Sequence, residues 1–176
     1  MKLYTFPASP NARKVAIVAA HLGVALEPVI VDLTKKETHT PEFLALNPNG
    51  RIPVLVDGDF VLWESNAIIQ YIAGRKPNSL WPEDARTRAD ITRWQCWQLA
   101  QWMEGVGALT RENLLKPMLM KMEPDPEQVK RGEEAFRRDA AVLDAHLARH
   151  PYLVVDALTL ADIAVGAYLM YAVPAK

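Results

Sequence analysis

Short apolar runs alternate with helical segments over residues 1–75 of the chain. The apolar runs predict β-strands, and apolar residues spaced three or four apart predict helices between them. The strands are expected at residues 2–6, 26–31, 53–56 and 60–62, and the helices at 10–22, 40–46 and 65–75. This order, β-α-β-α-β-β-α, indicates an α/β domain whose first two strands are parallel and whose last two form a tight hairpin at Asp57-Gly58.

Residues 85–176 show helical spacing only, and we interpret them as an all-α domain. Residues 76–84, which contain two prolines, form the predicted linker. Helices are expected at residues 85–116, 127–150 and 159–171. In the first of them Trp94, Leu99 and Trp102 are expected to be buried, and Cys96 is interpreted as a packing residue with no catalytic role.

Composition and charge exclude several classes of function. The chain has 176 residues, a formal net charge of −1 and one cysteine, which rules out an internal disulfide and a four-cysteine or Cys/His zinc site. The charge argues against a nucleic acid or a membrane surface as partner, because both favour a basic patch. The longest apolar run, residues 163–175, is shorter than the ~18 residues of a spanning helix. Since Pro7 also interrupts any signal-peptide core, we expect a cytoplasmic protein.

Two histidines have the spacing of metal ligands on a helix. His146 and His150 lie four residues apart, but the sequence around them offers no obvious third ligand. We interpret them as surface histidines and expect no metal site.

The first candidate for chemistry is Ser9-Pro10-Asn11, where the first strand gives way to the first helix. A hydroxyl there lies at a helix N-terminus, whose free N–H groups stabilise an anion such as a thiolate. On this segment alone, a plain N-cap serine is the simpler interpretation.

The second candidate is the stretch from Asn47 to Leu55, in which Pro53 opens a strand after a tight turn. The Ile52–Pro53 bond is a candidate cis bond, and a cis bond would present the backbone of Ile52 to an extended peptide ligand. A proline that only starts the strand is an equally good interpretation of this segment.

Two further motifs precede helices. Ser65 is expected to cap the helix at 65–75, where exposed amides would hold a carboxylate and the adjacent Glu64 an ammonium. Capping alone is again the simpler interpretation. Thr159 and Asp162 have the spacing of a capping box, which we regard as structural.

In their order and spacing these motifs resemble the cytosolic glutathione transferases over essentially the whole chain. The matching pieces are Phe43 through Asn47-Pro48 to Ile52-Pro53-Val54-Leu55, then Glu64-Ser65 with the helix that follows, then residues 159–162. Each is weak alone, and together they are specific. The resemblance implies a thioredoxin-like glutathione-binding domain at 1–75 followed by an all-α domain at 85–176, in a serine-type, bacterial-like member of the family.

The resemblance also implies residue roles. Ser9 matches the hydroxyl that activates the glutathione thiol, and Asn11 is a possible substitute for it. The positions that match glutathione-binding residues are Glu64 and Ser65 for the γ-glutamyl end, Ile52 and Pro53 for the cysteinyl backbone, and His39 and Arg51 for the glycyl carboxylate.

The chain departs from other branches of the family. Thr5 stands where tyrosine-type members carry their tyrosine, and Ser9 stands where cysteine-type members carry their cysteine. Family chains usually continue for a further helix or two after the helix at 159–171, so we expect the all-α domain to be truncated at its C-terminal end.

The implied activity is transfer of a glutathionyl group to a small apolar electrophile, as in detoxification, with glutathione as co-substrate and no further cofactor. Reduction of disulfides or peroxides at the same site is one alternative, and a non-catalytic glutathione-binding or partner-docking role is another. The resemblance also implies a homodimer with Asn66, Gln70, Arg93 and Trp97 near the seam.

Overall fold

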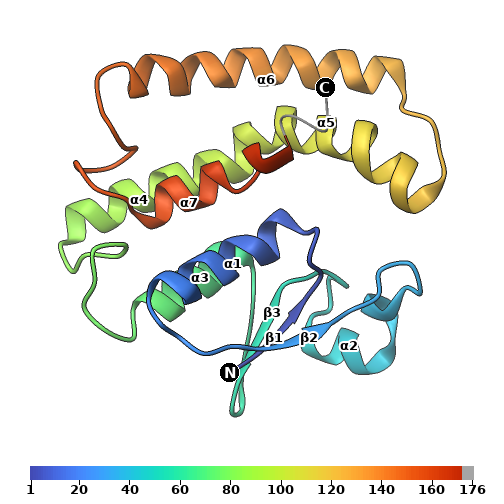
Figure 1. The fold of residues 1–176 in the computed structure, drawn as a ribbon, viewed down its shortest axis with the longest axis horizontal. Helices are drawn as coiled ribbons and strands as arrows, with labels where there is room; N and C mark the ends of the chain where they lie inside the picture. The colour runs from blue at the N-terminus through green and yellow to red at the C-terminus, as the bar shows by residue number, and fades with distance from the viewer. Residues whose placement is uncertain (172–176) are drawn as a thin grey trace. The chain divides into compact units, whose positions relative to one another are not determined.

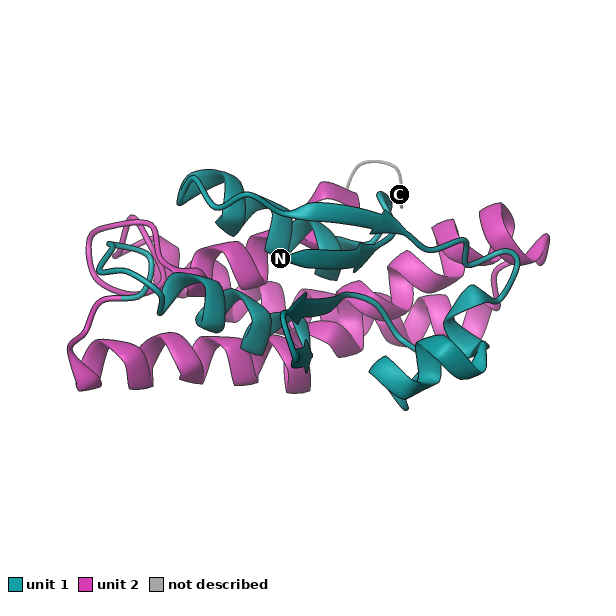
Figure 2. Cartoon of the chain, turned by 90° about the horizontal axis from the view of Figure 1, so that it is seen from below, with its two compact units in different colours: residues 1–81 teal, residues 82–176 magenta. Residues whose placement is uncertain are grey.

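A computed structural model of the chain describes residues 1–171 and divides the molecule into two compact units (Figure 2). The first is Met1–Trp81 and the second begins at Pro82, within the segment 76–84 that we interpret as the linker. Residues 172–176, and with them the end of the apolar run at 163–175, lie outside the described residues.

The first unit has the predicted β-α-β-α-β-β-α order with one added turn of 3₁₀ helix (Figure 1). Its elements are β1 (Lys2–Thr5), α1 (Pro10–His21), β2 (Glu27–Ile30), η1 (Glu37–His39), α2 (Pro41–Leu46), β3 (Val54–Asp57), β4 (Phe60–Trp63) and α3 (Ser65–Ala73). The four strands form one sheet in the order β2-β1-β3-β4. As predicted, β1 and β2 are parallel and β3 and β4 are antiparallel.

Alternation of side chains along the strands separates two faces of the sheet. Tyr4 and Val54, which are opposite each other in β1 and β3, belong to the face that packs on α2, where the Phe43 ring lies 6.0 Å from the Tyr4 ring. The neighbouring pair Leu3 and Leu55 is buried on the other face. Helices α1 and α3 pack against each other on that side (Figure 1).

The second unit is helical, and its first helical stretch is longer and less regular than predicted. It runs without interruption through α4 (Ala85–Trp97), η2 (Gln98–Gly107), α5 (Ala108–Thr110) and η3 (Arg111–Met120), and the two η segments are π-helical. The predicted end at residue 116 is wrong, because Pro117 lies inside η3 and the helix ends at Lys121, which is left-handed with φ 55°.

Two predictions about side chains on this stretch are wrong. Cys96 is exposed and therefore is not a packing residue, and Leu99 is 51% exposed. Trp94 and Trp102 are buried as expected. The inward face cannot be identified from apolar residues alone, because Gln95 and Gln98 are buried beside the tryptophans while Cys96 and Leu99 are exposed.

The remaining elements of this unit are α6 (Pro126–Leu147), α7 (Leu160–Gly166) and the 3₁₀ turn η4 (Leu169–Tyr171). The predicted capping box at the start of α7 is confirmed: Asp162 accepts the Thr159 N–H at 2.8 Å, and Thr159 Oγ1 accepts the Ala161 N–H at 3.3 Å. Within residues 1–171, none of the helices has the length and apolar character needed to cross a membrane.

Helix α6 and η2 approach each other closely at Gly105. A Cβ atom on Gly105 would lie 2.4 Å from the backbone nitrogen of Phe136, a separation that real Cβ contacts do not reach. Since the obstacle is backbone, it cannot move aside as a flexible side chain would. The absence of a side chain at Gly105 therefore allows this pair of helices to pack.

We expect Gly105→Ala to lower the free energy of unfolding by about 3 kcal/mol, the scale of overpacking in a rigid core. Gly166→Ala is the matched control, because among the described residues nothing lies within 4 Å of the added Cβ. That change should be neutral or stabilising by up to about 1 kcal/mol. Urea unfolding of both variants measures the difference, and equal stabilities would contradict the close approach.

Candidate functional site

The topology of the first unit brings all the predicted site residues to one end of the sheet. Val54, at the start of β3, pairs with Tyr4 near the end of β1 and with Trp63 at the end of β4. The parallel strand β2 ends at the same edge, where Ile30 pairs with Thr5. The segments that leave or enter the sheet here carry the predicted residues Ser9, Asn11, His39, Arg51, Ile52, Pro53, Glu64 and Ser65.

Ser9 caps α1 as the sequence predicts. Its backbone is extended, Pro10 occupies the first helical position, and Ser9 Oγ accepts the Ala12 N–H at 3.3 Å. A hydroxyl that accepts a hydrogen bond keeps its own proton for donation. Ser9 therefore places a donor beside the N-terminal end of the α1 dipole, where an anion is stabilised.

The Ile52–Pro53 bond is cis, which confirms that prediction. The turn before it is organised by Asn47, whose side chain is buried. Asn47 Nδ2 donates to the Arg51 carbonyl at 2.7 Å, and Asn47 Oδ1 accepts the Asn49 N–H at 3.0 Å. One amide side chain thus holds the loop that leads into Ile52.

Gly50 joins this loop to the turn that carries His39. Its φ of +59° is a conformation that favours glycine, and a Cβ there would lie 3.2 Å from the Thr38 carbonyl and 3.3 Å from His39 Nε2. His39 and Arg51 are therefore close in space and both exposed, so two basic side chains flank the same turn.

The junction between β4 and α3 differs from the prediction. Glu64 is the N-cap residue of α3, no side-chain cap bond is made there, and Ser65 is the first helical residue. The prediction that Ser65 caps the helix is wrong, because its hydroxyl is turned toward α1. Glu64 is exposed and has φ 69°, an unfavourable backbone conformation for a residue other than glycine.

Ser65 forms a buried hydrogen-bond network with α1. Ser65 Oγ donates to Asn11 Oδ1 at 3.0 Å and accepts from Lys14 Nζ at 3.1 Å. Lys14 Nζ also donates to Asn66 Oδ1 at 2.8 Å. Lys14 has no exposed surface, and Ser65 and Asn66 are 5% and 8% exposed. The N-terminal turns of α1 and α3 are thus joined through polar groups.

Lys14 is the functional candidate that sequence reasoning missed. Burial lowers the pKa of Lys14 to about 7, and the negative charge of Glu64 opposes part of this shift. The signal was present in the sequence, because Lys14 lies between the interior positions of α1, next to Val15 and one turn before Val18. A lysine on the apolar face of a predicted helix indicates a buried charge with dedicated partners.

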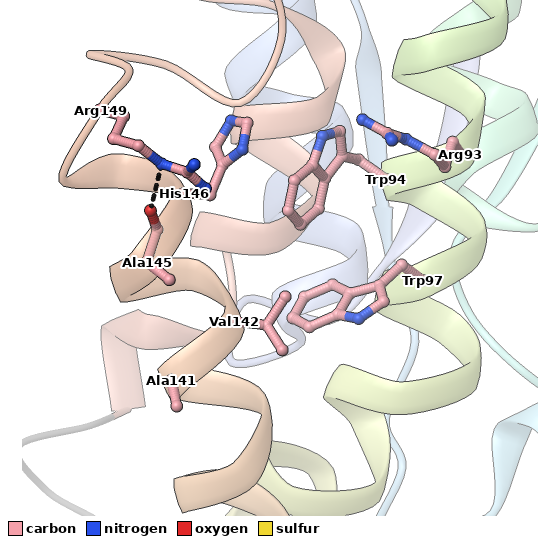
Figure 3. Close-up of a pocket in the computed structure, with 8 residues that line it drawn as sticks. All are labelled: Arg93, Trp94, Trp97, Ala141, Val142, Ala145, His146 and Arg149. Atoms are coloured by element: carbon pink, nitrogen blue, oxygen red, sulfur yellow. Dashed lines mark hydrogen bonds between the residues drawn. The ribbon is translucent and has the colours of Figure 1, made fainter.

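A separate hollow of about 600 Å³ lies in the second unit, between α4 and α6 (Figure 3). Trp94 and Trp97 line the α4 side with their rings 5.3 Å apart, edge to face, and the α6 side carries Val142 and two alanines. His146 is half-buried here, with its ring 5.0 Å from Trp94, so it is less exposed than we predicted, whereas His150 is exposed. None of the predicted site residues lines this hollow.

In residues 1–171, no group of three or more His, Cys, Asp or Glu side chains is arranged to hold a metal ion. The described site carries hydroxyl, amide and ammonium donors at two helix N-termini.

Comparison with known proteins assigns the family. Residues 1–74 match the model of the glutathione S-transferase N-terminal domain, and residues 126–176 match that of the C-terminal domain. Glutathione S-transferase 3 of Zea mays is 41% identical over 165 residues, which cover 92% of this chain and 73% of that protein. The chain belongs to the glutathione transferase family.

Solved structures agree with the fold. A possible glutathione S-transferase from Rhodopseudomonas palustris superposes with a TM-score of 0.90 at 30% identity, covering 99% of this chain and 78% of the other. A glutathione transferase from Phanerochaete chrysosporium, solved with oxidised glutathione, superposes with a TM-score of 0.85 at 33% identity, covering 99% and 79%. The predicted fold, a thioredoxin-like α/β unit followed by an all-α unit, is confirmed. The serine-type, bacterial-like subtype stays a prediction.

The lowered pKa of Lys14 predicts how stability depends on pH. Between about pH 7 and the ordinary lysine value of 10.5, the unfolded chain binds more protons than the folded chain, so the free energy of unfolding rises with pH. Below about pH 7 both states are protonated and this unfavourable contribution is constant. We expect Lys14→Met to flatten the rise by up to about 1.4 kcal/mol per pH unit.

Urea unfolding at a series of pH values measures this slope. Lys130→Met is the matched control, because Lys130 is exposed on α6 and should leave the parental slope intact. A Lys14→Met variant with the parental slope would contradict the lowered pKa.

Proposed function

We propose that the chain binds glutathione at the end of the sheet where α1 and α3 begin. The thiolate of the bound glutathione attacks an electrophile, which transfers the glutathionyl group to it. The observation that carries this proposal is the buried network that joins Asn11, Lys14 and Ser65 between the two helix N-termini. Membership of the glutathione transferase family supports the same reaction. Glutathione is the co-substrate, and the proposed reaction needs no other cofactor.

In the proposed complex, the two ends of glutathione are held by opposite charges. The backbone amides of Ser65 and the rest of the first turn of α3 hold the γ-glutamyl carboxylate, and Glu64 holds the γ-glutamyl ammonium. The unfavourable backbone of Glu64 supports this role, since such conformations gather at ligand sites. His39 and Arg51, which flank one turn, hold the glycyl carboxylate.

The backbone of Ile52 is proposed to bind the middle of glutathione, because an extended peptide pairs with an exposed strand end. The cis bond to Pro53 and the Asn47 contacts to the preceding turn support this placement. The cysteinyl residue of glutathione would then lie between Ile52 and the first turn of α1, where Ser9 and Asn11 are located.

Activation of the thiol requires only a small free energy. A free thiol has a pKa near 8.5, and lowering it by one to two units takes about 1.4 kcal/mol per unit. One hydrogen bond to a charged group contributes about 1.5–3 kcal/mol. The Ser9 hydroxyl, the Asn11 amide NH₂ and the α1 dipole together supply this stabilisation.

We expect Ser9→Ala to raise the thiol pKa of bound glutathione by about one to two units and to lower turnover of an aryl halide at neutral pH by up to about a hundredfold. A higher pH should restore part of the loss, and glutathione affinity should change little. Asn11→Ala and the double variant belong in the same series, because Asn11 also donates in this mechanism. Ser79→Ala, at an exposed linker position, is the matched control.

If both single variants and the double variant keep the parental turnover and thiol pKa, activation by Ser9 and Asn11 is wrong. A panel of an aryl halide, a disulfide and a hydroperoxide distinguishes transfer from reduction. We expect the aryl halide to be the best substrate, as a small apolar electrophile. A parental chain that binds glutathione but turns over nothing would indicate the non-catalytic alternative.

We also propose that the chain forms a homodimer in which a second copy covers the hollow between α4 and α6. Support comes from the exposed apolar side chains on these helices, Val142 within the hollow and Leu99 on the same helical stretch as Trp97. Arg93 and Trp97, which the family resemblance puts near the seam, line this hollow. Asn66, which it also puts there, is 8% exposed and bonded to Lys14, and therefore has little surface for a partner.

Sedimentation at micromolar concentration tests the homodimer. We expect the parent to sediment as a dimer and Val142→Glu to sediment as a monomer, because the change introduces a charge into the apolar contact. Val155→Glu changes a similarly exposed valine outside the hollow and should remain dimeric. A monomeric parent would contradict the proposal.

A further inference from the structure

When Lys14 is protonated, the hydrogen bonds between α1 and α3 run in one direction, and Lys14 sets that direction. A lysine ammonium offers three N–H donors and no acceptor. Ser65 Oγ, 3.1 Å from Lys14 Nζ, therefore accepts this hydrogen bond. The Ser65 proton is then donated to the acceptor 3.0 Å away, Asn11 Oδ1. The sequence of donation is Lys14 to Ser65 to Asn11.

This direction decides which end of the Asn11 side chain serves a ligand. Because Oδ1 accepts from Ser65, the carboxamide is held with its NH₂ group at the opposite corner, and NH₂ is the only donor of that side chain. We propose that Lys14 is a positioning residue: acting through Ser65, it fixes Asn11 with its NH₂ group as a donor to the glutathione thiolate. The inference rests on the proposed function and adds to it a residue that does not touch glutathione.

Packing between α1 and α3 does not by itself require a lysine here. Lys14 is flanked by Val15 and Val18, which are fully buried. An apolar side chain of similar length would fill the same space. The lysine is nevertheless kept in the interior, where burial lowers its pKa to about 7 despite the nearby charge of Glu64. What the lysine adds to packing is its donor character.

The thiol pKa of bound glutathione, measured by thiolate absorbance across pH, tests this role. Lys14→Met keeps the length of the side chain and removes the donor, whereas Lys14→Arg keeps a donor. We expect Lys14→Met to raise the thiol pKa by about one unit and to lower turnover at neutral pH roughly tenfold, with glutathione affinity changed by less than about threefold. Lys14→Arg should stay near the parental values. Lys130→Met again serves as the exposed control.

A double-mutant cycle with Asn11 separates positioning from a structural role. If Lys14 acts through Asn11, then Lys14→Met adds no further pKa shift to Asn11→Ala. An equal shift with and without Asn11 would overturn the proposal, because Lys14 would then act by another route. A parental thiol pKa in Lys14→Met would overturn it as well.

Ser65→Ala keeps the inference testable if Lys14→Met does not fold. This change breaks the same series of hydrogen bonds one step later and leaves the Ser65 backbone amide in place. The thiol pKa should rise in Ser65→Ala, and Ser65→Ala should again add nothing to Asn11→Ala. A shift that persists without Asn11, or no shift at all, would overturn the proposal.

Failure of the proposed function gives a different result. In that case the parental chain itself leaves the pKa of added glutathione at its free value and turns over no electrophile, and both proposals are overturned together. A parent that lowers the thiol pKa, combined with an unaffected Lys14→Met, overturns only the role of Lys14.

Discussion

Val54 is paired on both sides, with Tyr4 of β1 and with Trp63 of β4, and the place of the site depends on this double pairing. Both pairings are antiparallel, so the residues before β3 lie beside those that follow β1 and β4. A slip of one residue would turn Val54 away from the α2 face and Leu55 toward it, exchanging every buried side chain. The apolar core therefore fixes the register, and the register brings the polar segments together.

Polar groups then hold the first turns of α1 and α3 together. Lys14, Ser65 and Asn66 are buried, and each takes part in a hydrogen bond within the first unit. Such a network is favourable only when its members are satisfied, so it also specifies the rotamers of its members. Rigid donors are what a thiolate site needs, because donors already in place lose little by reorganising when the anion arrives. Stability and the proposed chemistry thus depend on the same contacts.

The sequence was sufficient for what periodicity and local motifs encode. The order of the strands along the chain, the Ser9 cap and the capping box at Thr159 could be predicted from short segments. The cis bond before Pro53 could be predicted only from its segment together with the family resemblance. The residues that contact one another across the fold could not be predicted from short segments. From its local sequence the Ser65 hydroxyl is expected to cap α3. In the structure it instead accepts a hydrogen bond from Lys14, which is 51 residues away in the sequence. Exposure of Cys96 likewise depends on which face of a tryptophan-rich helix packs inward, and composition does not determine that face.

We propose that glutathione occupies the end of the sheet where α1 and α3 begin. Titration of unlabelled glutathione into ¹⁵N-labelled protein, followed by amide chemical shifts, tests it directly. We expect the largest shifts on the amides of Ile52, Ser65 and Asn66, and smaller ones in the first turn of α1. Shifts concentrated around Trp94 and Val142 in the hollow between α4 and α6, with the amides of the first unit unchanged, would contradict it.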